Sequence, residues 1–289
     1  MTRSNRRTLD GKVALVSAAG RGIGRAIAIG LAEAGASVAV NSYGEETTHG
    51  TADAISKTGS RALPLVGDIT DPETILSTAA STIEHFGQID ILVNNVGAGP
   101  KQMPDSEPHA LGPAAALWDA LYDQNLRAAV LLTEAVVPAM VKQGHGKIVH
   151  VSSIAGRTSL SNRMLKFFTH PAYGAMKAAL CHYTTTLAET LGPRGINVNA
   201  VCPGIVWTDS WEKNAESAVA TLPEFKGQNA REWFEGIARG DYPEIFDRTP
   251  LRREQTVEDI ADAVVFLSSE AARNITGQSL MVDGGMVKI

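Results

Sequence analysis

Two side chains in this sequence could move a proton to or from an oxygen atom. Tyr173 and Lys177 are four positions apart in a segment, 172–191, whose pattern predicts a helix, so they lie on one helix face. A free tyrosine has a pKa of about 10, and a neighbouring ammonium group favours the phenolate and lowers that pKa. The pair could therefore protonate a ketone or deprotonate an alcohol.

The context of this pair matters, because most tyrosine–lysine pairs at this spacing are exposed helix neighbours. Ser152 and Ser153 end a predicted strand, 147–152, just upstream. A serine hydroxyl there could hydrogen-bond the same carbonyl oxygen. The alternative role for these serines is to cap the end of the strand, and we assign that role to Ser152.

A glycine-rich turn near the start of the chain could bind phosphate. Residues 12–17 form a continuous apolar run that predicts a buried strand, and Ala18-Ala19-Gly20-Arg21-Gly22-Ile23-Gly24 joins it to a helix predicted at 22–34. Glycines permit a tight turn and let backbone N–H groups approach a pyrophosphate at the helix N-terminus. The spacing is not GxGxxG, so the position directly after the first strand carries most of the weight.

The end of the second predicted strand, 37–41, bears on the choice of cofactor. Enzymes that select NAD commonly place a carboxylate there to hold the ribose 2′-hydroxyl, and this chain has none at 41–43. Ser42 and Tyr43 could hydrogen-bond a 2′-phosphate, and Arg21 could pair with it. We therefore expect NADP (NADPH) to be favoured over NAD. The glutamates at 45 and 46 argue weakly against this, and Arg21 could instead be a solvated turn residue.

Short apolar runs alternate with amphipathic helical segments along almost the whole chain. Further strands are predicted at 62–66, 89–94, 147–152, 196–201 and 279–282, and helices at 51–58, 72–86, 114–142, 172–191 and 257–267. This alternation predicts an α/β fold: a Rossmann-like, doubly wound parallel sheet of about seven strands with helices on both faces. We expect one domain, 10–289, after a flexible tail, 1–9, because no linker divides the chain.

Three segments interrupt the alternation: 97–113, 157–171 and 206–248. Long loops in compact domains are usually functional, and these three would leave the carboxyl ends of strands, where ligands bind. We interpret 206–248, which holds three of the four tryptophans, as a lid over an apolar or aromatic substrate. Packing of its aromatic residues into a small core of their own is nearly as good an interpretation. Side chains that could line the same pocket are Met103, Trp118, Leu160 and Met164.

Composition argues against several classes of protein. The net charge of −5 disfavours a nucleic-acid partner. No apolar run is long enough to cross a bilayer, so we expect no membrane association. Cys181 and Cys202 form neither a disulfide framework nor a CxxC site, which suggests buried thiols in a reducing cytoplasm. The histidines show no HExxH pattern, so we predict no metal.

Taken in order, these pieces resemble the short-chain dehydrogenase/reductase family, single-domain type, from about Asp10 to Gly285. Among its members the chain is similar to the ketoreductases of the 3-oxoacyl-carrier-protein reductase kind. Each motif is ordinary alone, and their order makes the resemblance specific. The motifs are Ser17-Ala18-x-x-x-Gly22-x-Gly24, Gly67-Asp68-Ile69-Thr70-Asp71, Asn94-Asn95-Val96-Gly97, Asn125, Ser153 with Tyr173 and Lys177, Pro203-Gly204, Thr276-Gly277-Gln278 and Val282-Asp283-Gly284-Gly285.

The resemblance implies hydride transfer between a nicotinamide and the carbonyl or secondary alcohol of a small substrate. Tyr173 would be the acid/base, and Lys177 would hold the nicotinamide ribose and lower the tyrosine pKa. Ser153 would steady the substrate oxygen, and Asn125 would position a proton-relay water. The implied cofactor contacts are Ala18, Arg21, Gly22, Ile23, Gly24, Ser42, Tyr43, Asp68 at the adenine, Ile69, Asn95, Gly97, Tyr173, Lys177, Pro203, Gly204 and Val206 beside the nicotinamide amide.

Two departures from the family pattern affect these expectations. Ala18 replaces the first glycine of the turn, so its Cβ would crowd the backbone if the site needs a positive φ. Nineteen residues lie between Ser153 and Tyr173, more than the family usually shows. These residues must loop out over the site if Ser153 is to reach the tyrosine.

Other functions are less well supported by the sequence. A non-catalytic NADP sensor would tolerate loss of Tyr173 or Lys177, and both are present. A β-ketoacyl-thioester reductase differs only in substrate, but the acidic segment 206–248 does not suit an acidic carrier protein. The apolar faces of 114–142 and 172–191 suggest a homotetramer or homodimer by family resemblance, or else burial within one subunit.

Overall fold

Seven parallel strands form one sheet in the order β3-β2-β1-β4-β5-β6-β7. The computed structural model describes residues 8–99, 115–246 and 249–287. The strands are β1 (Val13–Val16), β2 (Ser37–Ser42), β3 (Ala62–Val66), β4 (Ile91–Asn94), β5 (Gly146–Val151), β6 (Ile196–Pro203) and β7 (Ser279–Val282). The order reverses between β1 and β4, so the carboxyl ends of these two strands border a crevice of the kind that binds dinucleotides. The predicted fold class is confirmed.

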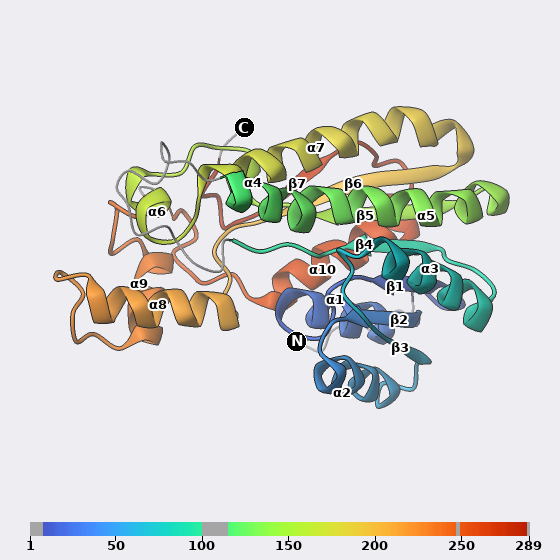
Figure 1. The fold of residues 1–289 in the computed structure, drawn as a ribbon, viewed down its shortest axis with the longest axis horizontal. Coiled ribbons are helices and arrows are strands. Elements are labelled where there is room, and N and C mark those ends of the chain that lie inside the picture. Colours follow the sequence, from blue (N-terminus) through green and yellow to red (C-terminus); the bar gives the residue numbers. More distant parts are fainter. Residues whose placement is uncertain (1–7, 100–114, 247–248, 288–289) are drawn as a thin grey trace.

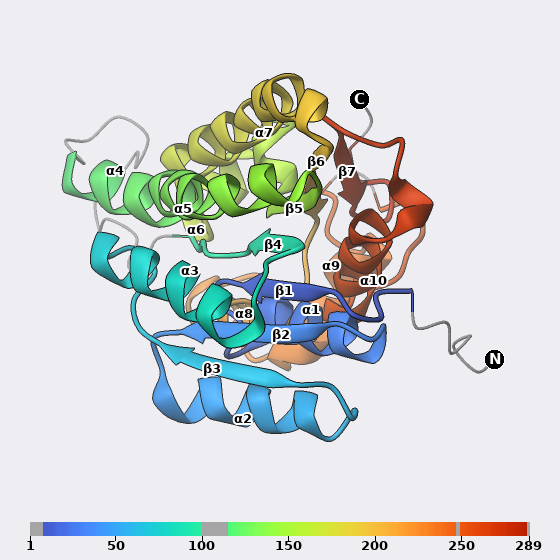
Figure 2. The same cartoon turned by 90° about the vertical axis from the view of Figure 1, so that its right-hand side faces the viewer.

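Helices cover both faces of the sheet (Figures 1 and 2). One face carries α1 (Gly22–Glu33), α2 (Glu45–Ser56) and α10 (Val257–Ser268), and the other carries α3 (Pro72–Phe86), α5 (Ala128–Gln143) and α7 (Pro171–Leu191). Strands β1 and β4 are buried along their whole length. This explains their continuous apolar sequences, because a parallel strand between two helical layers has no solvent-facing side.

Helix ends follow the local signals in the sequence. Asp71 caps α3, accepting a hydrogen bond from Thr74 N, and Pro72 occupies the first turn as predicted. Thr256 and Asp259 form a capping box at the start of α10. These caps fix where α3 and α10 begin, after β3 and after the segment 206–248 respectively.

The expected boundary of the N-terminal tail is wrong by at least one residue. Leu9 is 2% exposed and packs in the core under α1 and α10, and its backbone N–H donates to Ala34 O at 2.9 Å. The domain therefore begins before residue 10. Residues 1–7 lie outside the described part of the chain.

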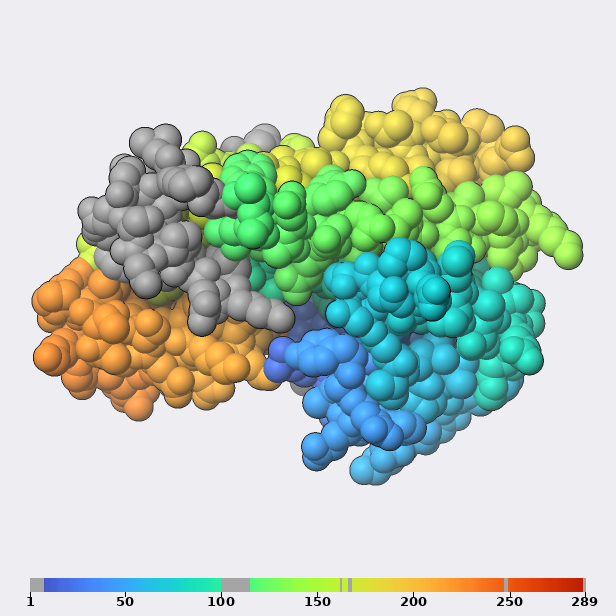
Figure 3. All heavy atoms as spheres, in the orientation of Figure 1, coloured from blue at the N-terminus to red at the C-terminus, as the bar shows by residue number. Residues whose placement is uncertain are grey.

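The two segments expected to be loops after β5 and β6 contain helices. Helix α6 (Asn162–Phe167) lies within 157–171, and α8 (Asp209–Thr221) and α9 (Ala230–Arg239) lie within 206–248. Polar sequences between short apolar runs hid these helices. In Figure 3 the segment with α8 and α9 forms the orange end of the molecule, next to the first, blue elements of the chain.

Helices α6, α8 and α9 share a hydrophobic cluster separate from the two cores that flank the sheet. Trp233 and Phe234 are fully buried there, and Phe168, at the end of α6, lies 5.8 Å from both Trp211 and Trp233, measured between ring centroids. The burial of Trp233 and Phe234 agrees with the interpretation that aromatic residues of this segment pack into a small core of their own. Trp211, in contrast, remains partly exposed. Met164 is also buried in this cluster, and Met103 lies outside the described residues.

Among the described residues, no helix has both the length and the apolar character needed to cross a membrane.

Candidate active site

The glycine-rich turn at the end of β1 is bound directly to the end of β4. Ser17 Oγ accepts hydrogen bonds from the backbone N–H groups of Asn95 (3.1 Å) and Val96 (3.3 Å). Asn95 Nδ2 donates to Ala18 O at 3.1 Å in return. The hydroxyl of Ser17 therefore joins the two strand ends across the switch point of the sheet.

The backbone of the turn needs two residues with positive φ. Gly22 has a φ of 53° and Ala18 has a φ of 50°. The expected crowding at Ala18 is therefore present, because an L-residue in this region costs about 1 kcal/mol. Gly24 cannot be replaced by a residue with a side chain unless its neighbours move, because a Cβ there would lie 2.4 Å from Ala18 O and from Asn95 Nδ2. Ile23 packs against the core below the turn.

Arg21 lies at the mouth of this turn and contacts two other elements. Its Nη2 donates to Tyr43 Oη at 3.1 Å, and its Nη1 pairs with Asp209 Oδ2 at 3.4 Å. Ser42 is buried under the turn. Its Oγ would lie 2.7 Å from a Cβ at position 20, so only a glycine fits there. The structure thus brings Arg21 and Tyr43 together as expected, and it adds Asp209, the first residue of α8.

The loop after β3 contains two of the predicted cofactor contacts, Asp68 and Ile69, which differ in exposure. Asp68 is exposed, and its Oδ1 accepts from Thr70 N at 2.9 Å and from Thr70 Oγ1 at 2.8 Å. Ile69 is buried in the core beside β4. The carboxylate is therefore held at the sheet edge where an adenine was expected, and Ile69 supports the loop from below.

Three predicted site residues converge at Gly97. Its φ is 149°, and a Cβ at this position would lie 2.6 Å from Lys177 Nζ and 2.7 Å from Asn125 Oδ1. Lys177 is only 3% exposed, and its Nζ donates to Val151 O at 3.0 Å. The absence of a side chain at position 97 therefore leaves the space in which an ammonium group and an amide oxygen face each other.

The helix predicted at 114–142 is present from Ala115 onward, and it includes a π-helical turn around Asn125 that the sequence pattern did not indicate. Helix α4 (Ala115–Tyr122) passes into α5 through a π-helical turn, Asp123–Arg127. The extra residue of such a turn changes the direction of the side chains, and π-turns are frequent at functional sites. Asn125 Nδ2 donates to Ala98 O (3.0 Å) and Leu121 O (3.1 Å). Its buried Oδ1 has no hydrogen-bond partner among the described residues.

Tyr173 meets Ser153, as the assignment of the serine requires. The residues between them loop out into α6, and Tyr173 lies close enough to Ser153 for the serine hydroxyl to lower the tyrosine pKa. Ser153 also accepts from Ala155 N at 3.1 Å, so it caps the short helix 154–156. Ser152, assigned to capping the strand, instead donates to Lys177 O at 2.9 Å and ties α7 to β5.

The pKa shifts differ from the expectation that Lys177 lowers the pKa of Tyr173. Burial raises the pKa of Tyr173, and the neighbouring hydroxyl of Ser153 offsets only part of that rise. Burial also lowers the pKa of Lys177 to about 8. Lys177 Nζ lies 5.8 Å from the tyrosine ring centroid and donates to Val151 O. Taken by itself, the protein therefore keeps Tyr173 protonated at neutral pH.

The loop after β6 closes the site from the side of the C-terminal strand. Gly204 N donates to Val282 O at 3.1 Å, and a Cβ at Gly204 would lie 2.4 Å from Gln255 Oε1. Val206 is buried and forms a parallel bridge with Gln255. Thr208, which the sequence analysis did not single out, lies over the turn, with its Cγ2 within 3.5 Å of a Cβ placed on Gly22. The only indication in the sequence was that Thr208 is a polar residue a few positions after Pro203-Gly204.

Comparison with known proteins identifies the family. The chain matches the family model described as Enoyl-(Acyl carrier protein) reductase over residues 17–287. It is 35% identical to the L-rhamnose 1-dehydrogenase (NAD(P)(+)) of Sphingomonas sp. (strain SKA58) over 96% of this chain and 97% of that protein. It is 33% identical to the 3-oxoacyl-[acyl-carrier-protein] reductase FabG of Escherichia coli (strain K12) over 97% of this chain and 99% of that protein.

Solved structures give the same result. A 7 alpha-hydroxysteroid dehydrogenase complexed with NADH and 7-oxo glycochenodeoxycholic acid matches with a TM-score of 0.78 and 34% identity, covering 100% of this chain and 99% of that one. L-sorbose reductase from Gluconobacter frateurii, complexed with NADPH and L-sorbose, matches with a TM-score of 0.83 and 30% identity, covering 98% of this chain and 99% of that one. The chain belongs to the short-chain dehydrogenase/reductase family and is an NAD(P)-dependent oxidoreductase.

The space at Gly97 can be tested with a single methyl group. We expect Gly97→Ala to lower kcat by roughly 10²-fold, because its Cβ displaces the Lys177 ammonium by an ångström or more. Gly99→Ala is the matched control, since a Cβ there meets nothing closer than 3.9 Å. Steady-state kinetics and thermal unfolding of both variants decide the matter. Equal activity in the two folded variants would contradict the importance of this space.

Proposed function

We propose that this chain reduces the carbonyl group of a small, free substrate with NADPH and catalyses the reverse oxidation of the secondary alcohol. The observation that supports this most strongly is the convergence of Lys177, Asn125 and Gly97 beside Tyr173 and Ser153. This cluster combines a proton donor, a buried cation and an unpaired amide oxygen at the carboxyl edge of the sheet.

A nicotinamide dinucleotide fits the residues along this edge. The turn 18–24 offers backbone N–H groups at the N-terminus of α1, and the glycine at 24 keeps helix and strand close enough for it. Asp68, Asn95 and Val206 would hold the adenine end, the middle and the nicotinamide amide respectively. The nicotinamide supplies or takes up the hydride.

Tyr173 acts as the general acid in the direction of reduction. Its hydroxyl donates a proton to the substrate oxygen while Ser153 holds that oxygen by a hydrogen bond. The raised pKa of Tyr173 keeps this proton in place at neutral pH. Lys177, charged below pH 8, stabilises the negative charge that remains on the phenolate once the proton has left.

Asn125 and Lys177 would restore the proton to Tyr173. The buried Oδ1 of Asn125 can accept a hydrogen bond that no described residue supplies, so we assign to it a water molecule of the proton relay. Lys177 Nζ lies across the space at Gly97 from the same atom. A proton taken up from solvent would then pass through this water and Lys177 to the Tyr173 phenolate, which restores the hydroxyl for the next reduction.

The preference for NADPH is supported by the pair of Arg21 and Tyr43. Tyr43, just after β2, and Arg21, in the turn before α1, are both exposed and hydrogen-bonded to each other, and residues 41–43 include no carboxylate that could bind a ribose 2′-hydroxyl. Arg21 is also bound to Asp209, which competes with a phosphate for the guanidinium group. Both dinucleotides occur among the similar solved structures, because the 7 alpha-hydroxysteroid dehydrogenase is complexed with NADH and the L-sorbose reductase with NADPH.

The substrate we propose is a small molecule with an apolar or aromatic face. Trp207 and Trp211 remain partly exposed after the core of the segment 206–248 is packed, and Trp118 is 40% exposed on α4. We propose that this segment, described here up to residue 246, closes over the substrate as a lid. Reduction of β-ketoacyl thioesters is the second candidate, supported by the similarity to the carrier-protein reductase.

We also propose that the protein works in the cytoplasm as a homotetramer or homodimer. The support is the family resemblance together with apolar side chains exposed on α4, Tyr122, and on the edge strand β7, Leu280. An apolar face of this kind is stabilised when a second copy covers it.

Loss of nicotinamide absorbance with a panel of ketones, including sugars, steroids and β-ketoacyl thioesters, tests the reaction and the acid. We expect Tyr173→Phe to lower kcat by about 10²- to 10⁴-fold, the usual contribution of a general acid. Tyr183→Phe, ten residues further along α7 and stacked on His150, should be unchanged. Turnover that survives in Tyr173→Phe would contradict the proposed acid, and tight NADPH binding without turnover of any substrate would favour the sensor.

Arg21→Gln tests the preference for NADPH. Loss of one charged hydrogen bond costs about 1.5–3 kcal/mol, so kcat/KM for NADPH should fall about ten- to hundredfold while that for NADH changes little. Arg25→Gln, exposed one turn further along α1, is the control. A similar loss with both cofactors would show that Arg21 supports the turn rather than the 2′-phosphate.

A further inference from the structure

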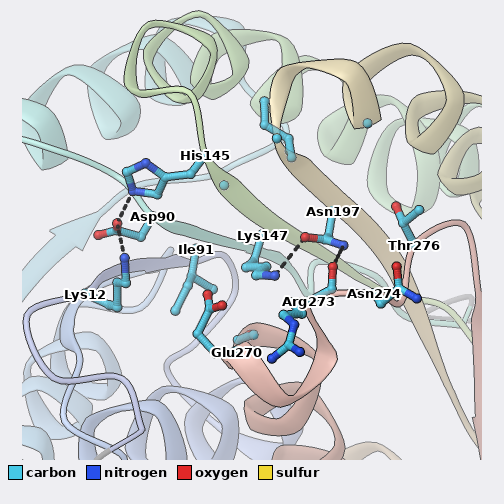
Figure 4. A pocket seen from close by; sticks show the side chains of 15 residues that line it. Lys12, Asp90, Ile91, His145, Lys147, Asn197, Glu270, Arg273, Asn274 and Thr276 are labelled. Carbon is cyan, nitrogen blue, oxygen red and sulfur yellow. Dashed lines mark hydrogen bonds and ion pairs between the residues drawn. The ribbon is translucent and has the colours of Figure 1, made fainter.

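A cavity lies at the amino ends of the strands, at the edge of the sheet opposite the proposed active site (Figure 4). Its volume is about 410 Å³, and residues at or just before the starts of β1, β4, β5 and β6 line it. Such a volume is at the lower end of the range for small-molecule sites. The charged side chains around it are Lys12, Asp90, His145, Lys147, Glu270 and Arg273.

The one deeply buried acid of this cavity is already satisfied. Asp90 accepts hydrogen bonds from Val13 N (2.8 Å), Gln88 Nε2 (2.7 Å) and Lys12 Nζ (3.3 Å), and its Oδ1 lies 2.8 Å from His145 Nε2. Figure 4 shows this group on one side of the cavity. Its negative charge is therefore neutralised where it stands and does not balance the cations on the other side.

Lys147, on that other side, lacks an anionic partner. Its Nζ donates to Asn197 Oδ1 at 2.7 Å. The amide is fixed in this orientation, because Asn197 Nδ2 donates to Arg273 O (3.1 Å) and Ile275 O (2.9 Å). An ammonium group has three hydrogens to donate, so two remain without an acceptor among the described residues. Burial accordingly lowers the pKa of Lys147.

Arg273 and Glu270 flank Lys147 at the rim without pairing with it. Among the described residues, none forms an ion pair with the side chain of Lys147, Arg273 or Glu270. The charge of Glu270 raises the pKa of Lys147 without direct contact, whereas the like charge of Lys12 lowers that pKa. Two cations with free donors thus face a polar cavity that the protein itself does not fill.

We propose that this cavity binds a small anion whose carboxylate or phosphate oxygens accept hydrogen bonds from Lys147 and Arg273. An anion would accept the hydrogen bonds that the half-buried ammonium group of Lys147 can still donate. Charged hydrogen bonds of this kind are stronger than neutral ones. Glu270 repels such a ligand and sets an upper limit on its affinity. Binding would stabilise the start of β5, whose other end carries Ser152 and Ser153.

The test is thermal unfolding of the full chain saturated with NADPH, so that the cofactor site is occupied. Inorganic phosphate and citrate are titrated separately at constant ionic strength against chloride. We expect the unfolding temperature to rise with phosphate or citrate beyond the effect of chloride, since a ligand that binds only the folded state stabilises it. The stronger of the two anions identifies phosphate or carboxylate as the preferred group.

Variants decide whether the effect comes from this cavity. Lys147→Gln and Arg273→Gln should each raise the apparent Kd at least tenfold, and Glu270→Gln should lower it. Arg194→Gln, exposed beside the cavity but not lining it, should leave the Kd unchanged. Arg273 is exposed, so its variant remains informative if Lys147→Gln does not fold. No shift beyond chloride, or an equal shift in the Arg273 and Arg194 variants, would overturn the proposal.

Discussion

Lys177 carries a charge inside the protein, and much of the site is arranged around that fact. Removing an ammonium group from water is costly unless hydrogen bonds replace the solvent. Here Val151 O accepts from Nζ, and the pKa still falls to about 8. Gly97 leaves space in front of the ammonium, and the π-turn directs Asn125 into the same space. Ser152 fixes the backbone of the lysine to the end of β5.

These contacts explain why separate elements have to meet within a few ångströms. The site draws on the ends of β1, β4, β5 and β6 and on the start of α7, and a shift of any of them would change what Lys177 faces. Ser17 and Asn95 hold β1 to β4, while Gln255 fills the space at Gly204 beside β6. The glycines at 24, 97 and 204 allow these close approaches, because a Cβ at each would meet an atom within 2.6 Å.

The sequence predicted what repeats regularly and missed what depends on packing. The parallel strands and the helical layers follow from alternating apolar runs, whereas the order of the strands in the sheet does not. Lys177 and Gly97 lie together, with Tyr173 and Ser153 beside them. The π-turn at Asn125 has no signature in the helical pattern, because one extra residue hardly alters the apolar spacing.

The remaining differences also arise from tertiary structure. Helix α6 and the residues around Trp233 share one hydrophobic cluster, in which segments 157–171 and 206–246 pack on each other. The raised pKa of Tyr173 reflects burial, which motif spacing does not reveal. Arg21 was expected near Tyr43, but its contact with Asp209 joins residues 188 positions apart. Local patterns predict such long-range pairs poorly.

The pH dependence of kcat/KM for NADPH tests the central role of the buried lysine most directly, since this parameter reports ionisations of the free enzyme. The pKa of Lys177 is lowered to about 8, so the charged form is lost as pH rises through that value, while Tyr173, with its raised pKa, stays protonated. We predict a fall in kcat/KM above about pH 8 in the wild type. In Lys177→Met the value should be low and show no such fall. A wild-type profile that stays level to pH 10, or the same fall in Lys177→Met, would contradict the account.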